Sequence, residues 1–309
     1  MRITFCCTGT KAAPWLEGLR AALPHATVEE WAPGAPQADH AVVWAPPQAM
    51  MDAQPALKGV FNIGAGVDAL MRLRLPAGAT VVRLDDAGMS VQMAEYVCHA
   101  VIRHFRELDV CAANQLDARW VFNKQLRRRD FPVGVMGMGV LGERVAKSLL
   151  QFEFPVNGWS RSPRAADGEY GVQGFHGAAQ FNDFLAASRV LVCLLPLTPE
   201  TVDIMRRDTL SRLRPGGYVI NVARGGHLVD EDLIALIDSG HLAGATLDVF
   251  RTEPLPEDHP FWAHPKITVT PHTSARTLRI ESIEQIARKI LAMERGEPVA
   301  GIVQTDRGY

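Results

Sequence analysis

Residues 133–142 read VGVMGMGVLG, and the ten residues that follow, ERVAKSLLQF, have the composition of a helix. In a turn from strand to helix, the first glycine of Gly-x-Gly-x-x-Gly allows the tight bend and the second lets a pyrophosphate approach the backbone. The third lets the helix pack closely on the strand. The helix N-terminus then faces the phosphate charge. The stretch predicts a dinucleotide-binding turn rather than an ordinary glycine-rich one, with cofactor contacts from Gly137, Met138, Gly139, Val140, Leu141 and Gly142.

The rest of the chain alternates short apolar strands with helices. Before the glycine turn the strand candidates are RITFCC, TVEEWA, HAVVWA, GVFNIG and TVVRL, and WLEGLRAAL is a helix with Leu16, Leu19 and Leu23 on one face. After the turn they are PVNGWS, YGVQGF, RVLVCLL, GYVINVA, GATLDVF and KITVTPH. Alternation of this kind favours an α/β fold with parallel sheets covered by helices.

Three stretches predict helices between or after these strands. Residues 90–129 contain no glycine or proline, so we expect one or two long helices there, with the charged run 127–130 as a solvated helix end. In VDEDLIALIDSGHLAG we expect Asp230 to cap a helix and Gly240 to end it. The last stretch, 280–297, has the pattern of an amphipathic helix.

Composition excludes several classes of protein. The 309 residues, 47% hydrophobic and 21% charged, suit a globular chain of two domains. A net charge of −2 gives no support to nucleic-acid binding, and no apolar run approaches the roughly 18 residues of a membrane span. The N-terminus lacks the apolar core of a secretory signal, so we expect a cytoplasmic protein. Five cysteines without CxxC spacing predict neither a disulfide framework nor a metal site.

The strand after the glycine turn predicts which dinucleotide is bound. An NAD site usually places Asp or Glu about 20 residues after the turn, where it binds the ribose hydroxyls. Here the strand ends in Ser160, Arg161 and Ser162, followed by Arg164. A guanidinium flanked by hydroxyls suits a 2′-phosphate, because it binds phosphate through two hydrogen bonds. We therefore predict a preference for NADP(H), with NAD(H) as the second cofactor. The alternative is that Arg161 stacks on the adenine ring without a strong preference.

Charged side chains follow three later strands. Arg224 lies in NVARGGHLVDEDL, Asp248 and Glu253 lie in LDVFRTEPLP, and His272 lies in VTPHTSA. Open parallel sheets bind ligands at the carboxyl ends of their strands. We therefore expect a cation, a carboxylate and an imidazole to meet beside one cofactor.

Together these segments resemble the D-isomer-specific 2-hydroxyacid dehydrogenase family, densely over residues 131–276. The likeness also rests on LLPLTPET at 194–201, NIGAGVDAL at 62–70 and MAEYV at 93–97. Within the family, VVWAPP, the short first domain and the WSRS segment are most similar to the glyoxylate/hydroxypyruvate reductase A type.

The resemblance implies reduction of a small 2-oxo acid, glyoxylate or hydroxypyruvate, to the 2-hydroxy acid by hydride transfer. Arg224 would bind the substrate carboxylate and polarise the keto oxygen, and His272 would be the general acid. Glu253 would orient the imidazole and favour its protonated form. Asp248 would help set the cofactor site, unless it only binds backbone amides. The further cofactor contacts implied are Leu195, Pro196, Val222, Ala223, Asp248 and Ser274.

The resemblance also implies two Rossmann-like or flavodoxin-like domains, each a doubly wound parallel sheet. A cofactor domain at 93–276 would be inserted in a discontinuous substrate domain, 1–92 and 277–309. In the substrate domain, Ala65 and Gly66 would bind the substrate carboxylate through backbone N–H groups, and Trp44 would either line the pocket or belong to the core. Arg276 and Arg279 would contact the substrate or a partner subunit, and family precedent implies a homodimer.

Several alternatives remain within and outside the family. Formate dehydrogenases carry Gln where Glu253 stands, which argues against that activity. Phosphoglycerate- and lactate-type dehydrogenases share the fold, although many of the former carry a further regulatory domain. Nucleotide-sensing co-repressors of the family are chiefly interaction proteins, and we expect them to carry long flanking tails. No tyrosine among Tyr96, Tyr170 and Tyr218 has Lys four residues on, as short-chain reductases do, and no GK[ST] segment occurs.

Overall fold

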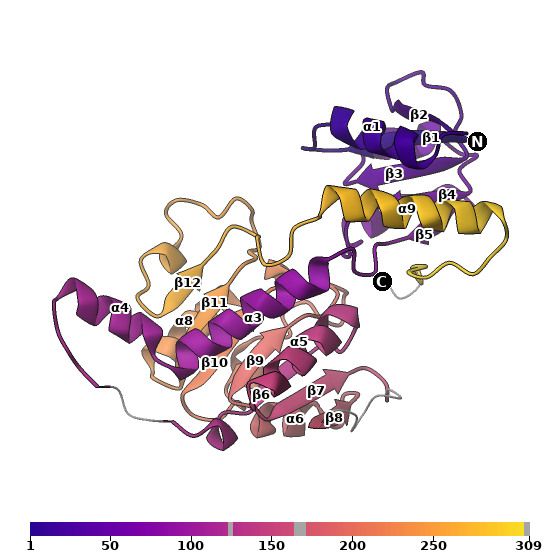
Figure 1. Cartoon of the computed structure of the whole chain (residues 1–309). Coiled ribbons are helices and arrows are strands. Elements are labelled where there is room, and N and C mark those ends of the chain that lie inside the picture. The colour runs from indigo at the N-terminus through magenta and orange to yellow at the C-terminus, as the bar shows by residue number, and fades with distance from the viewer. Residues whose placement is uncertain (123–125, 164–170, 306–309) are drawn as a thin grey trace. The chain divides into compact units, whose positions relative to one another are not determined.

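The computed structural model describes residues 1–122, 126–163 and 171–305. The chain divides into two compact units, of which the first comprises residues 1–89 and 277–309 and the second residues 90–276 (Figure 1). The second unit is therefore inserted between two parts of the first.

A five-stranded parallel sheet forms the centre of the first unit, in the order β2-β1-β3-β4-β5. The strands are β1 (Arg2–Cys7), β2 (Thr27–Glu30), β3 (His40–Trp44), β4 (Gly59–Asn62) and β5 (Thr80–Val82). The helices are α1 (Ala13–Ala22), α2 (Gln48–Ala53), the short 3₁₀ helix Leu70–Arg72 and α9 (Arg279–Glu294). This strand order is that of a flavodoxin-like sheet.

Helix α9 is far from α1 in sequence but packs against it (Figure 1). Its apolar positions Ile283, Ile286 and Ile290 are buried at helical spacing, and α1 buries Trp15 and Leu19. At Gly18 an added Cβ would lie 2.5 Å from the Ile283 side chain, so the glycine allows the two helices to approach closely.

The second unit has a seven-stranded parallel sheet in the order β12-β11-β10-β9-β6-β7-β8. Its strands are β6 (Val133–Met136), β7 (Val156–Ser160), β8 (Val172–His176), β9 (Val190–Cys193), β10 (Gly217–Asn221), β11 (Leu242–Leu247) and β12 (Ile267–Val269). Its helices are α3 (Met89–Phe105), α4 (Leu108–Leu116), α5 (Val140–Gln151), α6 (Phe181–Ala187), α7 (Arg207–Leu210) and α8 (Asp230–Asp238). Single-turn 3₁₀ helices cover Arg128–Asp130, Gly225–His227 and Pro260–Trp262. The order matches a Rossmann sheet extended by one strand.

Helices cover both faces of this sheet. On one face, Val133 and Val135 of β6 pack with residues of α3 and α5, and on the other Met136 packs with residues of α6, α7 and α8. All four residues of β6 are buried, as a central strand of a parallel sheet requires. The predicted α/β class with two doubly wound parallel sheets is confirmed. No helix in the described ranges combines the length and apolarity needed to span a membrane.

Two expectations about helices differ from the structure. Two helices do form within the stretch 90–129, but the second ends at Leu116, well before residue 129, and Glu107 separates the two with a left-handed φ of 50°. Helix α4 buries no residue, so no apolar face extends it further, and the charged run forms only the turn Arg128–Asp130. Asp230 does not cap α8: Val229 occupies the cap position, and the Asp230 carboxylate lies 3.5 Å from His259.

Candidate active site

The glycine turn links β6 to α5 with the geometry that a pyrophosphate needs. Gly137 has a φ of 106°, and an added Cβ there would lie 2.7 Å from the Leu194 carbonyl oxygen. At Gly142 an added Cβ would lie 2.0 Å from the Gly137 carbonyl oxygen. At Gly139, the N-cap of α5, it would meet nothing within 4 Å, so the backbone is open to a ligand there. The three glycines thus differ in environment as the phosphate-binding motif requires.

This turn lies at the point in the sheet where the order of successive strands reverses. β6 is flanked by β7 on one side and β9 on the other, so the connections after β6 and β9 diverge. Met138 packs over Gly158 of β7, Leu141 is partly buried against the core, and Val140 is half exposed. Ligands of doubly wound sheets bind in the crevice at such a point.

The end of β7 carries the residues expected to select the cofactor. The Ser160 hydroxyl donates to the Ser162 carbonyl oxygen at 2.8 Å, and Arg161 between them is exposed. The hydroxyl of Thr198 holds the pKa of Glu200 below its ordinary value, and the charge of Arg161 adds to this effect. The charge of Arg161 therefore acts on the loop after β9, which contains Glu200. Arg164 lies outside the described residues.

Other expected cofactor contacts have their side chains in the core. Leu195, Val222, Ala223 and Ser274 are each less than a tenth exposed. Contacts from these four residues to a bound cofactor would therefore be made by backbone atoms. Pro196, in the same loop as Leu195, accepts hydrogen bonds from other residues through its carbonyl oxygen.

Arg224, Glu253 and His272 follow three neighbouring strands, β10, β11 and β12, and the structure brings them together. His272 Nδ1 lies 2.8 Å from Glu253 Oε2, and their side chains are 44% and 37% exposed. Because Nδ1 is bound to Glu253, a proton given to a ligand would come from Nε2. Burial acts to raise the pKa of Glu253. Hydrogen bonds from the His272 and Phe250 N–H groups and the nearby Arg224 charge outweigh burial, so the pKa lies below its ordinary value. Glu253 is thus an anion beside two potential cations.

Asp248 holds the backbone on which His272 lies. Its carboxylate is completely buried and accepts hydrogen bonds from the Thr270 hydroxyl and from the amides of Thr273 and Ser274. Its main-chain oxygen accepts from the His272 amide at 2.8 Å. Asp248 therefore binds the backbone of residues 272–274, which was one of its two expected roles.

His227 is a polar residue of this region that the sequence pattern did not single out. It is completely buried, and its ring nitrogens lie 3.0 Å from the Arg224 carbonyl oxygen and 3.2 Å from that of Pro196. Burial acts to lower the pKa of His227, but Cys193 and the two carbonyl oxygens outweigh it and raise the pKa. His227 therefore ties the Arg224 turn to the loop after β9. Only its place three residues after Arg224 could have drawn attention to it.

In the first unit, the expected anion-binding loop follows β4. The buried Asn62 side chain donates to the carbonyl oxygens of Gly64 and Gly66, which fixes the loop. Trp44, at the end of β3, lies so close to Gly64 that an added Cβ there would be 2.4 Å from the indole ring. Trp44 thus packs on the loop that contains Ala65 and remains half-buried.

Arg276 and Arg279 are both exposed. The backbone of Arg276 is bound by the side chain of Gln92 through two hydrogen bonds, and Arg279 begins α9. Within residues 1–122, 126–163 and 171–305, no hydrogen bond or ion pair places either guanidinium at the site.

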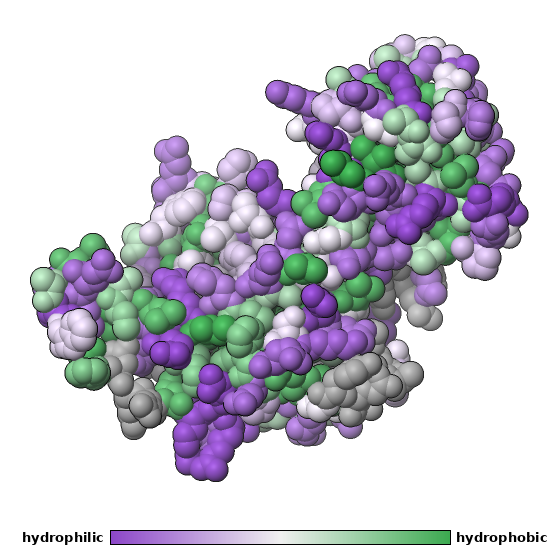
Figure 2. Space-filling view, viewed as in Figure 1, coloured by the Kyte–Doolittle hydropathy of each residue, from purple (hydrophilic) through white to green (hydrophobic). Residues whose placement is uncertain are grey.

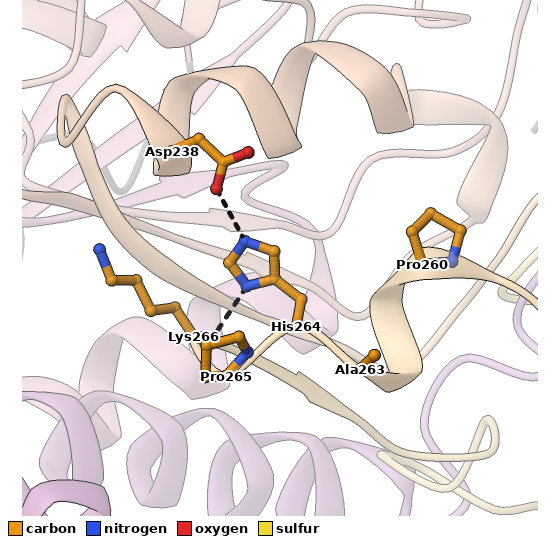
Figure 3. A pocket seen from close by; sticks show the side chains of 6 residues that line it. All are labelled: Asp238, Pro260, Ala263, His264, Pro265 and Lys266. Atoms are coloured by element: carbon orange, nitrogen blue, oxygen red, sulfur yellow. Dashed lines mark hydrogen bonds and ion pairs between the residues drawn. The ribbon is translucent and has the colours of Figure 1, made fainter.

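A surface depression at the other edge of the sheet is not part of this site. Asp238, Pro260, Ala263, His264, Pro265 and Lys266 line it, and His264 Nε2 lies 3.3 Å from Asp238 Oδ1 (Figure 3). His264 and Lys266 precede β12, whereas His272 follows it. The depression is therefore at the amino ends of the strands, whereas Arg224, Glu253 and His272 follow the carboxyl ends.

A glycine turn at the switch point of a parallel sheet, with an arginine and a glutamate-paired histidine at neighbouring strand ends, is the arrangement of a dinucleotide-dependent oxidoreductase. The model of the D-isomer specific 2-hydroxyacid dehydrogenase NAD-binding domain matches residues 98–274. Over the whole of both chains, this sequence is 44% identical to glyoxylate/hydroxypyruvate reductase A of Photorhabdus laumondii and 46% identical to that of Serratia proteamaculans. The chain therefore belongs to the D-isomer-specific 2-hydroxyacid dehydrogenase family and is an NAD(P)-dependent oxidoreductase, as its sequence predicted.

Solved structures agree with this assignment. A D-isomer specific 2-hydroxyacid dehydrogenase from Xanthobacter autotrophicus Py2, in complex with NADPH and MES, is similar with a TM-score of 0.93 and 38% identity. An NADPH-dependent glyoxylate/hydroxypyruvate reductase from Sinorhizobium meliloti, in complex with NADP and sulfate, is similar with a TM-score of 0.91 and 33% identity. Each similarity covers 100% of this chain and 99% of the other.

Proposed function

We propose that this chain reduces a small 2-oxo acid, glyoxylate or hydroxypyruvate, to the 2-hydroxy acid with NADPH. The observation that carries the proposal is the convergence of Arg224 with the Glu253–His272 pair at strand ends of the sheet that bears the glycine turn. The names of full-length relatives at 44–46% identity support the substrate class. Ser160, Arg161 and Ser162, with relatives solved in complex with NADPH and NADP, support the cofactor.

The described residues fit a dinucleotide. The backbone is open over Gly139, whereas Gly137 and Gly142 leave no room for a side chain. Gly139 also caps the twelve-residue helix α5, whose N-terminus favours an anion. Gly137 to Gly142 would therefore hold the pyrophosphate, and Arg161 the 2′-phosphate. Bound NADPH would supply the hydride that the 2-oxo carbon accepts.

In the proposed mechanism the chain binds the acid and supplies a proton. Arg224 binds the substrate carboxylate and polarises the keto oxygen, because a guanidinium offers several donors in one plane. As the carbon accepts hydride, negative charge grows on that oxygen, and protonated His272 donates its Nε2 proton there. Glu253 holds Nδ1 and stabilises the imidazolium, so the proton is available without loss of ring orientation. After the hydroxy acid leaves, His272 regains a proton from water.

We assign the two units different roles within this proposal. Residues 93–276 would form the cofactor domain, and residues 1–92 with 277–309 would form the substrate domain. Ala65 and Gly66 would bind the substrate carboxylate through their N–H groups, and Trp44 would limit the size of the substrate. With five cysteines and no CxxC spacing, the sequence suits a reducing compartment, and we place the reaction in the cytoplasm.

We further propose that the active form is a homodimer joined through the second unit. Helix α4 buries none of its residues, and apolar side chains are exposed on it and after it (Figure 2). Leu116, Trp120 and Phe122 are 89%, 89% and 87% exposed. The Trp120 and Phe122 rings contact each other edge to face, and exposed apolar surface of this kind marks an association site.

The test of the activity is a panel of 2-oxo acids with the full chain. We expect saturable oxidation of NADPH with glyoxylate and hydroxypyruvate, with kcat/KM above about 10⁴ M⁻¹ s⁻¹, and lower values with bulkier acids. A folded protein that binds NADPH but reduces none of these acids would disprove the proposal.

A further inference from the structure

A chain of hydroxyl groups runs from helix α3 to the loop that carries His272. The Tyr96 hydroxyl lies 2.5 Å from Thr270 Oγ1, and Thr270 Oγ1 donates to Asp248 Oδ1 at 2.5 Å. Because the single proton of Thr270 goes to Asp248, Tyr96 must be the donor in the first bond. Hydrogen bonds in such a chain polarise and strengthen one another. Tyr96 thus stabilises the buried Asp248 carboxylate through Thr270.

That carboxylate determines the path of the backbone at His272. Besides the Thr270 hydroxyl, it accepts hydrogen bonds from the amides of Thr273 and Ser274, and the Asp248 main-chain oxygen accepts one from the His272 amide. His272 has a φ of 52°, in the left-handed region that residues with a side chain seldom adopt. A non-glycine residue remains in that conformation only where its surroundings hold it there. The bonds to Asp248 provide this restraint.

Helix α3 binds the same segment at three places. Gln92 Nε2 donates to the Arg276 carbonyl oxygen at 3.0 Å, and Gln92 Oε1 accepts from the Arg276 amide at 3.2 Å. Arg103 Nη1 donates to Thr268 Oγ1 at 2.6 Å. Tyr96 lies between these two residues, four positions after Gln92 and seven before Arg103, so all three are on one side of the helix. The bond from Tyr96 is the one that reaches the carboxylate under His272.

Tyr96 is suited to act as a permanent donor. Burial raises the pKa of Tyr96 to about 12, so the phenol keeps its proton throughout the working range of an enzyme. The charge of the buried Asp248 carboxylate also acts to raise the pKa of Tyr96.

We propose that Tyr96 is a positioning residue for His272, which it restrains through Thr270 and Asp248. The proposal rests on the proposed function, in which the imidazole must reach the keto oxygen of a bound acid. Proton transfer requires donor and acceptor to lie within hydrogen-bond reach, and small displacements cost large factors in rate. Tyr96 touches neither substrate nor cofactor in this account, so its loss should lower kcat and leave binding unchanged.

The test compares Tyr96→Phe with Tyr218→Phe in the full chain. Tyr218 makes a similar bond to a β11 threonine, since its hydroxyl lies 2.9 Å from Thr246 Oγ1, but that bond does not lead to Asp248. For Tyr96→Phe we expect kcat for hydroxypyruvate about 10-fold below wild type, with KM and the Kd of NADPH within about 2-fold. Tyr218→Phe should keep the wild-type kcat. Equal losses in the two variants, or no loss in Tyr96→Phe, would overturn the proposal.

A mutant cycle separates positioning from loss of fold. Thr270→Val breaks the chain of bonds one step later, so adding Tyr96→Phe to it should lower kcat no further, whereas Thr270→Ser should restore activity. Independent, additive losses would overturn the proposed route.

Hydrogen exchange gives a readout that needs no turnover. The amides of His272, Thr273 and Ser274 should exchange faster in Tyr96→Phe than in wild type or in Tyr218→Phe. Unchanged exchange would overturn the proposal. If wild type reduces no 2-oxo acid, the proposed function fails, and the exchange rates still decide whether Tyr96 restrains this loop.

Discussion

The Nδ1 atom of His272 lies 2.8 Å from Oε2 of Glu253, a residue 19 positions earlier in the chain. Both follow strands of one sheet, β12 and β11, and Arg224 follows the next strand, β10. The parallel sheet therefore brings together, at one edge, an anion, an imidazole and a cation that no local pattern would place in contact.

Replacing Glu253 with Gln should change the pH dependence of reduction. The pKa of Glu253 lies below its ordinary value of 4.5, so at neutral pH the carboxylate is ionised and favours a protonated imidazole. As pH falls, the Glu253 carboxylate therefore stays ionised at the pH where an ordinary glutamate takes up a proton, and its ion pair with His272 is lost only at lower pH. In Glu253→Gln this anion is absent, so the imidazolium loses its charged partner and the alkaline limb of the kcat/KM profile should move to lower pH.

The control for this change is Glu257→Gln, which removes an exposed carboxylate from the same loop region. Its profile should coincide with that of wild type. If Glu253→Gln also keeps the wild-type profile, Glu253 does not act on the proton donor.

The activity should depend on both the charge and the planar guanidinium of Arg224. Arg224→Lys keeps the charge but loses the planar pair of donors, so we expect kcat/KM about 100-fold below wild type, and a larger loss in Arg224→Leu. Arg214 precedes the same strand, β10, and donates to the Ala186 carbonyl oxygen instead. Arg214→Lys should retain wild-type kinetics with 2-oxo acids. Normal KM and kcat in Arg224→Leu would contradict the assignment.

Arg161 should determine the preference between NADPH and NADH. Without its guanidinium the 2′-phosphate loses a charged partner, whereas NADH has no such phosphate. In Arg161→Ala, kcat/KM for NADPH should fall about 10- to 100-fold, and that for NADH should stay within about 3-fold. Equal losses with the two cofactors would support stacking of Arg161 on adenine instead.

The exposed apolar residues after α4 should be covered in a homodimer. We expect sedimentation velocity to give twice the mass of one chain for wild type. Replacing both Trp120 and Phe122 with Ser should shift the population to monomer, because it removes apolar area from the interface. A monomeric wild-type protein at micromolar concentration, or a double variant that remains a dimer, would rule out this interface.

The sequence predicts the strands and the glycine turn well because their signals are local. Four-residue apolar runs such as Val133–Met136 are strands wherever helices cover both faces of a parallel sheet, and Gly137 must turn where no side chain fits. The prediction of helix up to residue 129 is wrong because the extent of a helix depends on packing that is not local in the sequence. Good helix formers without a buried face do not extend a helix, and α4 stops at Leu116.

The contacts beneath the site could not be predicted in the same way. Thr270 lies 174 residues after Tyr96, and neither residue type signals a pair at that separation. Asp248 presents the same uncertainty, because its sequence position suits a residue facing the cofactor as well as one that binds backbone amides. Only the packed sheet shows its carboxylate bound to Thr270, Thr273 and Ser274.

The role of His272 as proton donor is tested most directly by the rate of a single turnover, measured by mixing enzyme and NADPH with hydroxypyruvate and following NADPH absorbance. We expect His272→Asn to bind NADPH with a Kd within about 2-fold of wild type but to oxidise it about 10² to 10⁴ times more slowly, since Asn cannot supply the proton. Oxidation by His272→Asn at the wild-type rate would contradict this role.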